Sequence, residues 1–170
     1  MVLTCTIGAN AKKTECAGVD ATREGMLAQF DKLIVNGAYD VRLVAGSHFS
    51  YKITCDANFL DFMLITQKDN EVKAIIKPYR TKCAVKPVLE LTYPNDNTFS
   101  NLNIEANAGA KINADKLIIK STLDIEANAA SSFISLGVTA PEIKIELNAH
   151  STANINTIDA TSLDVELKSA

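Results

Sequence analysis

The sequence predicts an all-β protein whose C-terminal two-thirds is a β-solenoid with about 20 residues per coil. A seven-residue motif recurs four times at an almost constant spacing in this part of the chain. Short runs of alternating apolar and polar residues, which are typical of strands, precede the repeats, and helical periodicity is not sustained anywhere. We expect a leader or capping segment over residues 1–29 and a single β-solenoid domain over residues 30–170.

The first 29 residues have no sustained periodicity. They carry Gly8, Gly18 and Gly25 among small and polar residues, which predicts a loose leader with at most a short helical turn over residues 23–29. The ends of a solenoid expose unpaired backbone, so we expect the leader to cover one end. The charged tail over residues 166–170 is expected to discourage strand pairing with other chains at the other end.

Residues 30–97 predict a series of strands separated by turns. Asn36-Gly37 and Ala45-Gly46 supply turns between the first of these strands, and residues 93–97 form a strong turn at the end of the region. The alternating apolar positions are Leu33, Val35, Val41, Leu43, Tyr51, Ile53 and Cys55. Further strands are expected over residues 59–65, 72–76 and 85–91.

The repeats begin at residue 102. They read LNIEANA from Leu102, LDIEANA from Leu123, IKIELNA from Ile143 and LDVELKS from Leu163, so successive copies lie 21, 20 and 20 residues apart. A fixed period near 20 residues indicates a unit that buries its apolar face only by stacking on its neighbours. The period is too short for a pair of helices, and the signature of leucine-rich repeats is missing. One coil of a β-solenoid is the structure that fits.

Strand side chains alternate between two faces, so the apolar members of each repeat are expected to point inward and to stack in files. The three expected inner files are Leu102, Leu123, Ile143 and Leu163; Ile104, Ile125, Ile145 and Val165; and Ala106, Ala127, Leu147 and Leu167. A second wall is expected from Ile112, from Phe133 or Ile134, and from Ile155. A third wall is expected from residues 117–119, residues 136–138 and Ile158.

Composition argues against several classes of partner. The formal charge of -3 gives no electrostatic reason to expect nucleic acid or an anionic membrane. Aromatic residues make up only 6% and Trp is absent, which argues against a stacking platform for bases or sugars. Apolar runs are too short for membrane insertion, and the first residues do not read as a secretory signal.

The cysteines and histidines do not form a recognisable metal-binding pattern. Zinc sites usually need paired cysteines at close spacing, and no such pair occurs among Cys5, Cys16, Cys55 and Cys83. The pairing nearest in sequence joins Cys5 to Cys16 and Cys55 to Cys83, but four cysteines allow three connectivities, and buried free thiols are equally ordinary. His48 and His150 have no nucleophile context around them and are expected in loops.

Two segments resemble a known family. FDKLIVNGAYDVRLVAG, over residues 30–46, is similar to the family's strand-turn-strand entry, and LELTYPNDNTFSNLNIEANAGAKI, over residues 89–112, is similar to its proline and small-residue loop segment. With the repeats that follow, the chain from residue 30 onward resembles the putative autotransporter adhesin head GIN domain family of bacterial proteins. The resemblance implies a right-handed parallel β-helix in an exported or envelope-associated protein, without established catalytic residues.

The loops after the repeats depart from the family pattern. The family uses glycine-serine-glycine loops, whereas this chain has asparagine at positions 107, 128 and 148. Asparagine tolerates positive φ, so we expect it to replace glycine at the left-handed corners. The architecture survives this replacement, but a ligand-contacting role for a glycine loop does not carry over.

The strongest candidate for a functional site is on the outward face of the repeats, a column of Glu105, Glu126, Glu146 and Glu166. Stacked carboxylates raise one another's pKa unless they are neutralised, and they are candidates for a cation site or an acid and base pair. The simpler interpretation is a solvated face neutralised by Lys120, Lys144 and Lys168. A second column, Asn107, Asn128 and Asn148, is expected to hydrogen-bond from coil to coil. The basic residues Lys77, Arg80, Lys82 and Lys86 are interpreted as a solvated strand or turn.

These observations predict a noncatalytic structural or binding domain, adhesin-like and located in the periplasm or at the cell surface. It would present flat solenoid faces to an unknown protein or polysaccharide partner. No catalytic, cofactor-binding or metal-binding residue is assigned, and no cofactor is expected. The alternative is a carbohydrate-active β-helix enzyme that uses the stacked carboxylates. A third possibility is a module that only spaces out another part of an envelope assembly.

Overall fold

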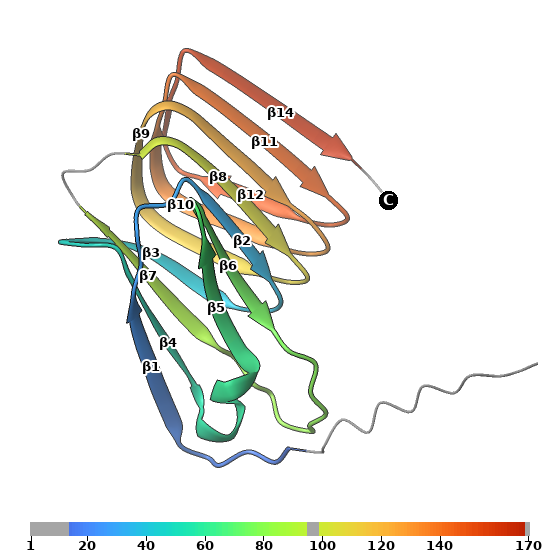
Figure 1. The fold of residues 1–170 in the computed structure, drawn as a ribbon. Helices are drawn as coiled ribbons and strands as arrows, with labels where there is room; N and C mark the ends of the chain where they lie inside the picture. Colours follow the sequence, from blue (N-terminus) through green and yellow to red (C-terminus); the bar gives the residue numbers. More distant parts are fainter. Residues whose placement is uncertain (1–13, 95–98, 169–170) are drawn as a thin grey trace, which may run out of the picture.

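The computed structural model describes residues 14–94 and 99–168 and is built from strands, with one short 3-10 helix (Figure 1). The all-β class is therefore confirmed. The N-terminal elements are β1 (Asp20–Met26), β2 (Lys32–Asn36), β3 (Asp40–Gly46), β4 (Ser50–Asp56), η1 (Ala57–Phe62), β5 (Met63–Lys68), β6 (Glu71–Ile76) and β7 (Val88–Pro94). The C-terminal elements are β8 (Phe99–Asn107), β9 (Lys111–Ala127), β10 (Ser132–Thr139), β11 (Glu142–Asn148), β12 (Thr152–Ile155), β13 (Ile158–Asp159) and β14 (Ser162–Lys168).

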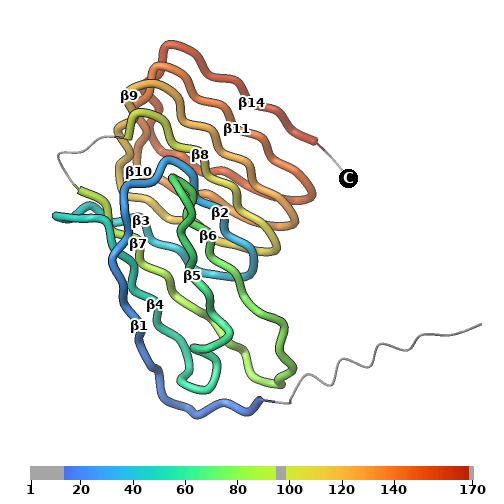
Figure 2. The backbone as a smooth tube through the Cα atoms, viewed as in Figure 1, coloured from blue at the N-terminus to red at the C-terminus, as the bar shows by residue number. Residues whose placement is uncertain are grey.

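The four repeats lie on β8, the second half of β9, β11 and β14, which pair side by side in parallel (Figure 2). The register matches the spacing of the repeats in sequence, so residues at equivalent positions lie next to one another. All three predicted inner files are present, including Ile104, Ile125, Ile145 and Val165. Burial fades along this file, because Ile125 is fully buried whereas Val165 at the end of the stack is 50% exposed.

A second face is formed where β3, the first half of β9, β10 and β12 pair in parallel. Because β9 runs through both faces, the strands form one strongly curled, 14-stranded sheet around a shared core. Phe133 continues the file of Ile112, as expected, but Ala153 follows it, and Ile155 pairs with Ser135 instead. The prediction for Ile155 was therefore wrong by two residues. The third wall is present as Leu117, Val138 and Ile158.

The corners that follow the repeat strands differ from the prediction. The asparagines are not the residues with positive φ; the two residues after each asparagine are. These left-handed pairs are Ala108 and Gly109, Ala129 and Ala130, and Ala149 and His150. The asparagine side chains have another role, described below, and alanine accepts the left-handed conformation although its Cβ makes that conformation unfavourable.

Replacing Ala130 by glycine is expected to stabilise the protein by about 1 kcal/mol, because Ala130 has φ of 61° and Gly109 occupies the equivalent corner position of the preceding coil. The free energy of unfolding, measured with denaturant, tests this expectation. The matched control is Ala45→Gly in β3, an exposed strand position, which should destabilise by about 0.5–1 kcal/mol. Two changes of the same sign would contradict the argument.

The N-terminal half is not built from uniform parallel coils. β1, β4 and β7 pair antiparallel, as do β5 and β6, and these groups extend the two faces beyond β3 and β2. Residues 20–26 form the edge strand β1, so the predicted helical turn beginning at residue 23 is wrong there. The strand β7 runs to Pro94, and the rest of the expected turn over residues 93–97 lies outside the described residues.

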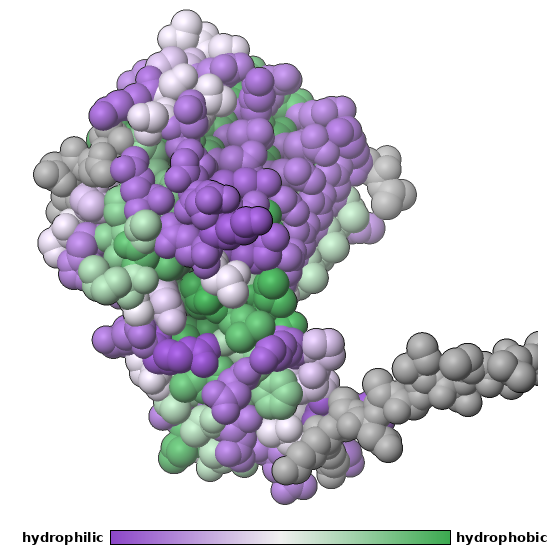
Figure 3. All heavy atoms as spheres, viewed as in Figure 1, coloured by the Kyte–Doolittle hydropathy of each residue, from purple (hydrophilic) through white to green (hydrophobic). Residues whose placement is uncertain are grey.

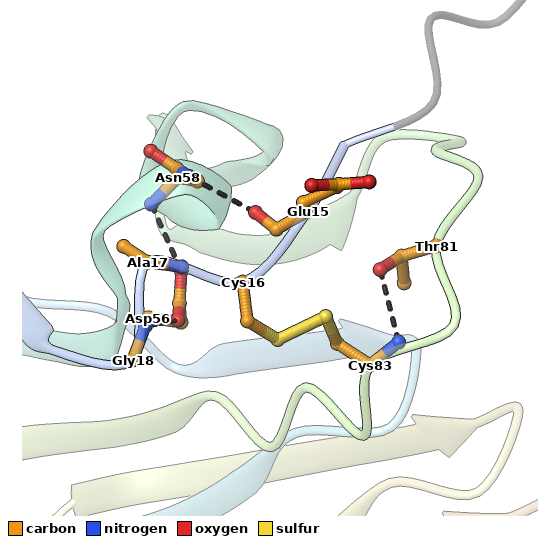
Figure 4. Close-up of a disulfide and its surroundings, with 8 residues drawn as sticks. All are labelled: Glu15, Cys16, Ala17, Gly18, Asp56, Asn58, Thr81 and Cys83. Carbon is orange, nitrogen blue, oxygen red and sulfur yellow. Dashed lines mark hydrogen bonds between the residues drawn. A yellow bond between two sulfur atoms is a disulfide. The ribbon is translucent and has the colours of Figure 1, made fainter.

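Aromatic residues and a disulfide cover the N-terminal end of the core. Phe59 of η1 is fully buried and contacts Tyr79, with ring centroids 4.9 Å apart, and Phe62 joins the same cluster. Cys16 forms a disulfide with Cys83 in the segment after β6 (Figure 4). The sequence-nearest pairing is therefore wrong; Cys55 is a buried free thiol, and Cys5 lies outside the described residues.

Asp56 holds residues 17 and 18 in place beside this disulfide through hydrogen bonds. Its carboxylate accepts hydrogen bonds from the backbone N–H groups of Ala17, Gly18 and Asn58, at 3.1, 2.9 and 3.0 Å (Figure 4). The bond from Ala17 is the main cause that holds the pKa of Asp56 below its ordinary value, and the bonds from Gly18 and Asn58 act in the same direction. Residues 16–18 are thus held by hydrogen bonds to Asp56, next to the start of η1, as well as by the disulfide to Cys83.

The contribution of Asp56 to stability is expected to depend on pH. A carboxylate with a depressed folded pKa stabilises the protein above its unfolded pKa, and this contribution is lost as the pH falls through the folded pKa. Wild type should therefore melt at a higher temperature than Asp56→Asn at neutral pH, and the gap should close in acid. Thermal melts of both proteins across the acid range provide the measurement. A gap that stays constant down to the lowest pH would contradict this role.

Candidate functional site

The outward side of the repeat strands β8, β9, β11 and β14 forms the candidate site, which we call the polar face. Hydrophilic residues cover this side of the molecule in the space-filling view (Figure 3). The side chains are set by the strand alternation: while the isoleucines point inward, the glutamates and asparagines between them point outward. Parallel in-register pairing then places equal residues next to one another in rows across the face.

The asparagine row is a continuous chain of side-chain hydrogen bonds. Asn148 donates to Asn128 at 2.8 Å, Asn128 donates to Asn107 at 3.0 Å, and Asn107 donates to Asn36 at 2.9 Å. The predicted hydrogen bonding along the asparagine row is present between neighbouring strands, and the row is longer than expected because Asn36 of β2 belongs to it. In the sequence, Asn36 followed by Gly37 indicates a turn, although the position of Asn36 after the apolar residues of β2 matches that of the later asparagines.

The glutamate row is tied to the asparagine row. Each of Glu105, Glu126 and Glu146 accepts a 2.8 Å hydrogen bond from the asparagine two residues later. The amide nitrogen of each of these asparagines therefore donates hydrogen bonds both to the glutamate of its own strand and to the asparagine of a neighbouring strand. These bonds hold the carboxylates in fixed positions on the face.

Lys168 ends the asparagine row and contacts the last two glutamates of the neighbouring row. It occupies the position next to Asn148 where a further asparagine would continue the ladder, and its Nζ lies 2.9 Å from Glu146 and 3.3 Å from Glu166. The hydrogen bonds from Asn148 and then Lys168 hold the pKa of Glu146 below its ordinary value. At Glu146 the pKa therefore moves in the direction opposite to the mutual rise expected for stacked carboxylates.

The three lysines named from the sequence do not play equal parts. Lys168 forms ion pairs with two members of the glutamate row, Glu146 and Glu166, whereas Lys144 lies 3.2 Å from Glu142, outside that row. The hydrogen bond from Lys144 is the main cause that lowers the pKa of Glu142. Among the ion pairs of residues 14–94 and 99–168, none joins Lys120 to this face.

The remaining candidates lie away from the polar face. His48 is in the turn between β3 and β4, where its Nδ1 lies 2.9 Å from the Ser47 hydroxyl, and His150 is at a left-handed corner. Both are turn residues, as predicted. The basic residues from Lys77 to Lys86 lie along the segment between β6 and β7, which the disulfide at Cys83 fastens.

Hollows on the surface are shallow and open. One of about 170 Å³ lies on the polar face and is lined by Asp124, Lys144, Ile145, Glu146, Asp164 and Glu166. Two of about 410 Å³ lie on the second face, one beside Tyr51 and one between Arg42, Glu90 and Leu136. Within the part of the chain that the structure describes, no three His, Cys, Asp or Glu residues are grouped to hold a metal ion. Chemically, the polar face offers regularly spaced carboxylates and amides on an open surface.

Removing one member of the ladder tests its importance. Asn128→Ala deletes the bonds to Asn107 and Glu126 and leaves Asn148 without its acceptor, so we expect a loss of about 2 kcal/mol in the free energy of unfolding. Asn154→Ala, at an exposed position of β12, is the matched control and should change it by less than about 0.5 kcal/mol. Equal effects from the two variants would show that the ladder adds nothing.

Comparisons with known proteins identify similar folds only. No family model matches the sequence, and no curated protein matches it. A putative adhesin from Parabacteroides distasonis ATCC 8503 has a similar structure, with a TM-score of 0.56 and 14% identity over 92% of this chain and 80% of that one. A putative adhesin from Parabacteroides merdae ATCC 43184 gives 0.54 and 14%, over 92% and 95% of the two chains. The chain thus shares the all-β fold of two proteins that are named as adhesins, and no helix of its described residues is long and apolar enough to span a membrane.

Proposed function

We propose that this chain is a noncatalytic, adhesin-like surface domain that binds a protein or a polysaccharide through its polar face. The observation that carries the proposal is the pair of hydrogen-bonded glutamate and asparagine rows. Because their side chains are already fixed, a partner that binds there orders few additional groups, which favours recognition by a flat surface. The names of the two structural neighbours are in keeping with this role.

The architecture that we propose for this role is a right-handed parallel β-helix of the GIN domain kind, in which residues 30–170 form one domain. The parallel register of the four repeats and the stacked inner files support a solenoid for the C-terminal part. In such a fold each coil adds one more set of outward side chains to the same face. The antiparallel strands at the N-terminal end then act as a cover for the first coil.

Location outside the cytoplasm, in the periplasm or at the cell surface, is part of the proposal. The Cys16–Cys83 disulfide supports it, since structural disulfides persist in oxidising compartments and are rare in the cytosol. A charge of -3 and the acidic character of the polar face argue against a nucleic-acid partner.

A carbohydrate-active enzyme is the less favoured alternative. Glycosidases place two carboxyl groups on opposite sides of a sugar-sized cleft, with one of them kept protonated. Here the carboxylates lie side by side along an open face, and the pKa of Glu146 is lowered by its hydrogen bonds. The described residues of this open face provide no cleft between two carboxyl groups, and the lowered pKa of Glu146 makes that residue a poor acid for protonating a leaving group.

A binding experiment separates these functions. Labelled protein is applied to a polysaccharide array and to immobilised extracellular-matrix proteins, and we expect saturable binding to at least one of them. Glu126→Lys, in the middle of the polar face, should weaken it by about tenfold or more, whereas Glu24→Lys at the edge strand β1 should not. Equal binding by both variants would place the contact elsewhere. Release of new reducing ends from a bound polysaccharide would favour the enzyme.

A further inference from the structure

The two ends of the strand stack differ. At the N-terminal end, the core is covered by η1, by the aromatic cluster around Phe59 and by the segment fastened through Cys83. At the other end, β14 pairs only with β11, and β12 and β13 pair only with β10, among the described residues. We call β12, β13 and β14 together the open end; Figure 1 draws β14 as the outermost strand of its face.

The open end exposes residues that the repeat pattern assigns to the core. Leu163, Val165 and Leu167 continue the three inner files, yet they are 49%, 50% and 73% exposed. Ile158 continues the third wall and is also exposed. An edge strand with alternating apolar residues and unpaired backbone groups is a template for pairing with another strand.

We propose that the open end is a homodimer interface, in which β14 of a second copy pairs antiparallel with β14 about a two-fold axis. A second copy is the occupant that matches this end. A two-fold axis through the middle of the open end places β14 next to β14 of the second copy and β12 next to β12 of the second copy. Both exposed strand edges are therefore paired in one contact. Such a contact is self-complementary and stops at two copies. Stacking of the open end on the covered N-terminal end of another copy would instead meet the aromatic cap and the disulfide segment.

Charge selects the register of this pairing. Apolar side chains must face the same core, which leaves registers centred on Asp164, Val165 or Glu166 as the three that pair most of the strand. Centring on Asp164 would set the two aspartates opposite each other and Ser162 against the partner's Glu166, so no opposite charges would meet. Centring on Val165 would set Asp164 against the partner's Glu166 twice, with like charges opposed. Centring on Glu166 sets Asp164 against the partner's Lys168 twice and Val165 against the partner's Leu167. The two glutamates at the axis are then each flanked by Lys168, which already lies 3.3 Å from Glu166 within one chain.

The first test measures the mass of the 170-residue chain by sedimentation equilibrium over a range of concentrations, with a dimer expected. Leu167→Lys should raise the dimer dissociation constant by about tenfold or more, since a charge would be buried between the cores. Leu136→Lys, a change of equal chemistry at a 60% exposed residue of β10, should leave it unaltered. A monomer at every concentration would overturn the proposal, as would a dimer that Leu167→Lys leaves intact.

The second test reads the register directly. In Asp164→Lys alone, two lysines of each subunit would face two lysines of the other, and in Lys168→Asp alone aspartates would face aspartates. Each variant should therefore dissociate more readily than wild type by about tenfold or more. Mixing the two variants should restore the dimer, because every Lys then faces an Asp across the axis. Circular dichroism confirms that each variant is folded, and a mixture that stays monomeric would overturn the antiparallel pairing.

Discussion

Replacing both Cys16 and Cys83 by serine is expected to lower the free energy of unfolding by about 4 kcal/mol. The disulfide joins residues 67 positions apart, and closing a loop of that length removes much conformational freedom from the unfolded chain. It also links the residues before β1 to the segment after β6, where the aromatic cluster covers the core. Chemical denaturation of the double variant and of wild type, both without reductant, measures the difference.

Reduction provides the control for this expectation. Wild type in dithiothreitol should behave like the double variant, and dithiothreitol should leave the double variant unchanged. The remaining described thiol, Cys55, does not interfere, because burial raises its pKa and limits its reaction. Peptide mapping without reduction should recover a fragment in which Cys16 and Cys83 are joined. Coincident unfolding curves for oxidised and reduced wild type would refute the stabilising role.

The Ile125→Ala change is expected to cost about 3–4 kcal/mol of stability. Ile125 is fully buried in the middle inner file, between Ile104 and Ile145, so the substitution leaves a cavity that the neighbouring strands cannot fill without losing their pairing. The denaturant midpoint should fall while the slope of the transition stays the same.

The same strand offers a matched control. Ile118→Ala removes the same atoms from β9, but Ile118 is exposed on the outer surface, so the expected loss is below about 1 kcal/mol. Similar losses from the two variants would mean that the inner file is not a packed core, and the account of how the repeats stabilise the protein would fail.

The repeats could be predicted because two independent signals agree on them. The 20-residue period fixes which residues lie next to one another, and the alternation within each repeat fixes which of them point inward. Together they place Leu102 beside Leu123 and Ile104 beside Ile125, as in the structure. The asparagine ladder follows from the same register, since position and chemistry both repeat.

The N-terminal half could not be predicted in the same way. Alternation at Tyr51, Ile53 and Cys55 indicates a strand, but it reads the same for parallel and antiparallel partners, and no repeat fixes a register there. The partner of Cys16 could not be predicted for a related reason, because distance in sequence says little about distance in space. Cys83 lies near Cys16 only because of the path that the segment after β6 takes past η1. At the corners, the sequence predicts that asparagine adopts the left-handed conformation. In the structure, the two residues after each asparagine adopt it instead, and the asparagine amide group forms hydrogen bonds along the row.

The uniform register of the four repeat strands also affects how a protein of this kind can change in length. Each repeat strand contacts the one before it and the one after it through the same set of positions. A duplicated or deleted unit of 20 residues would therefore leave every surviving neighbour with an equivalent partner, while the disulfide-bonded N-terminal cover stayed untouched. Evolution could thus lengthen or shorten the polar face by whole repeats while the buried residues keep the same pattern.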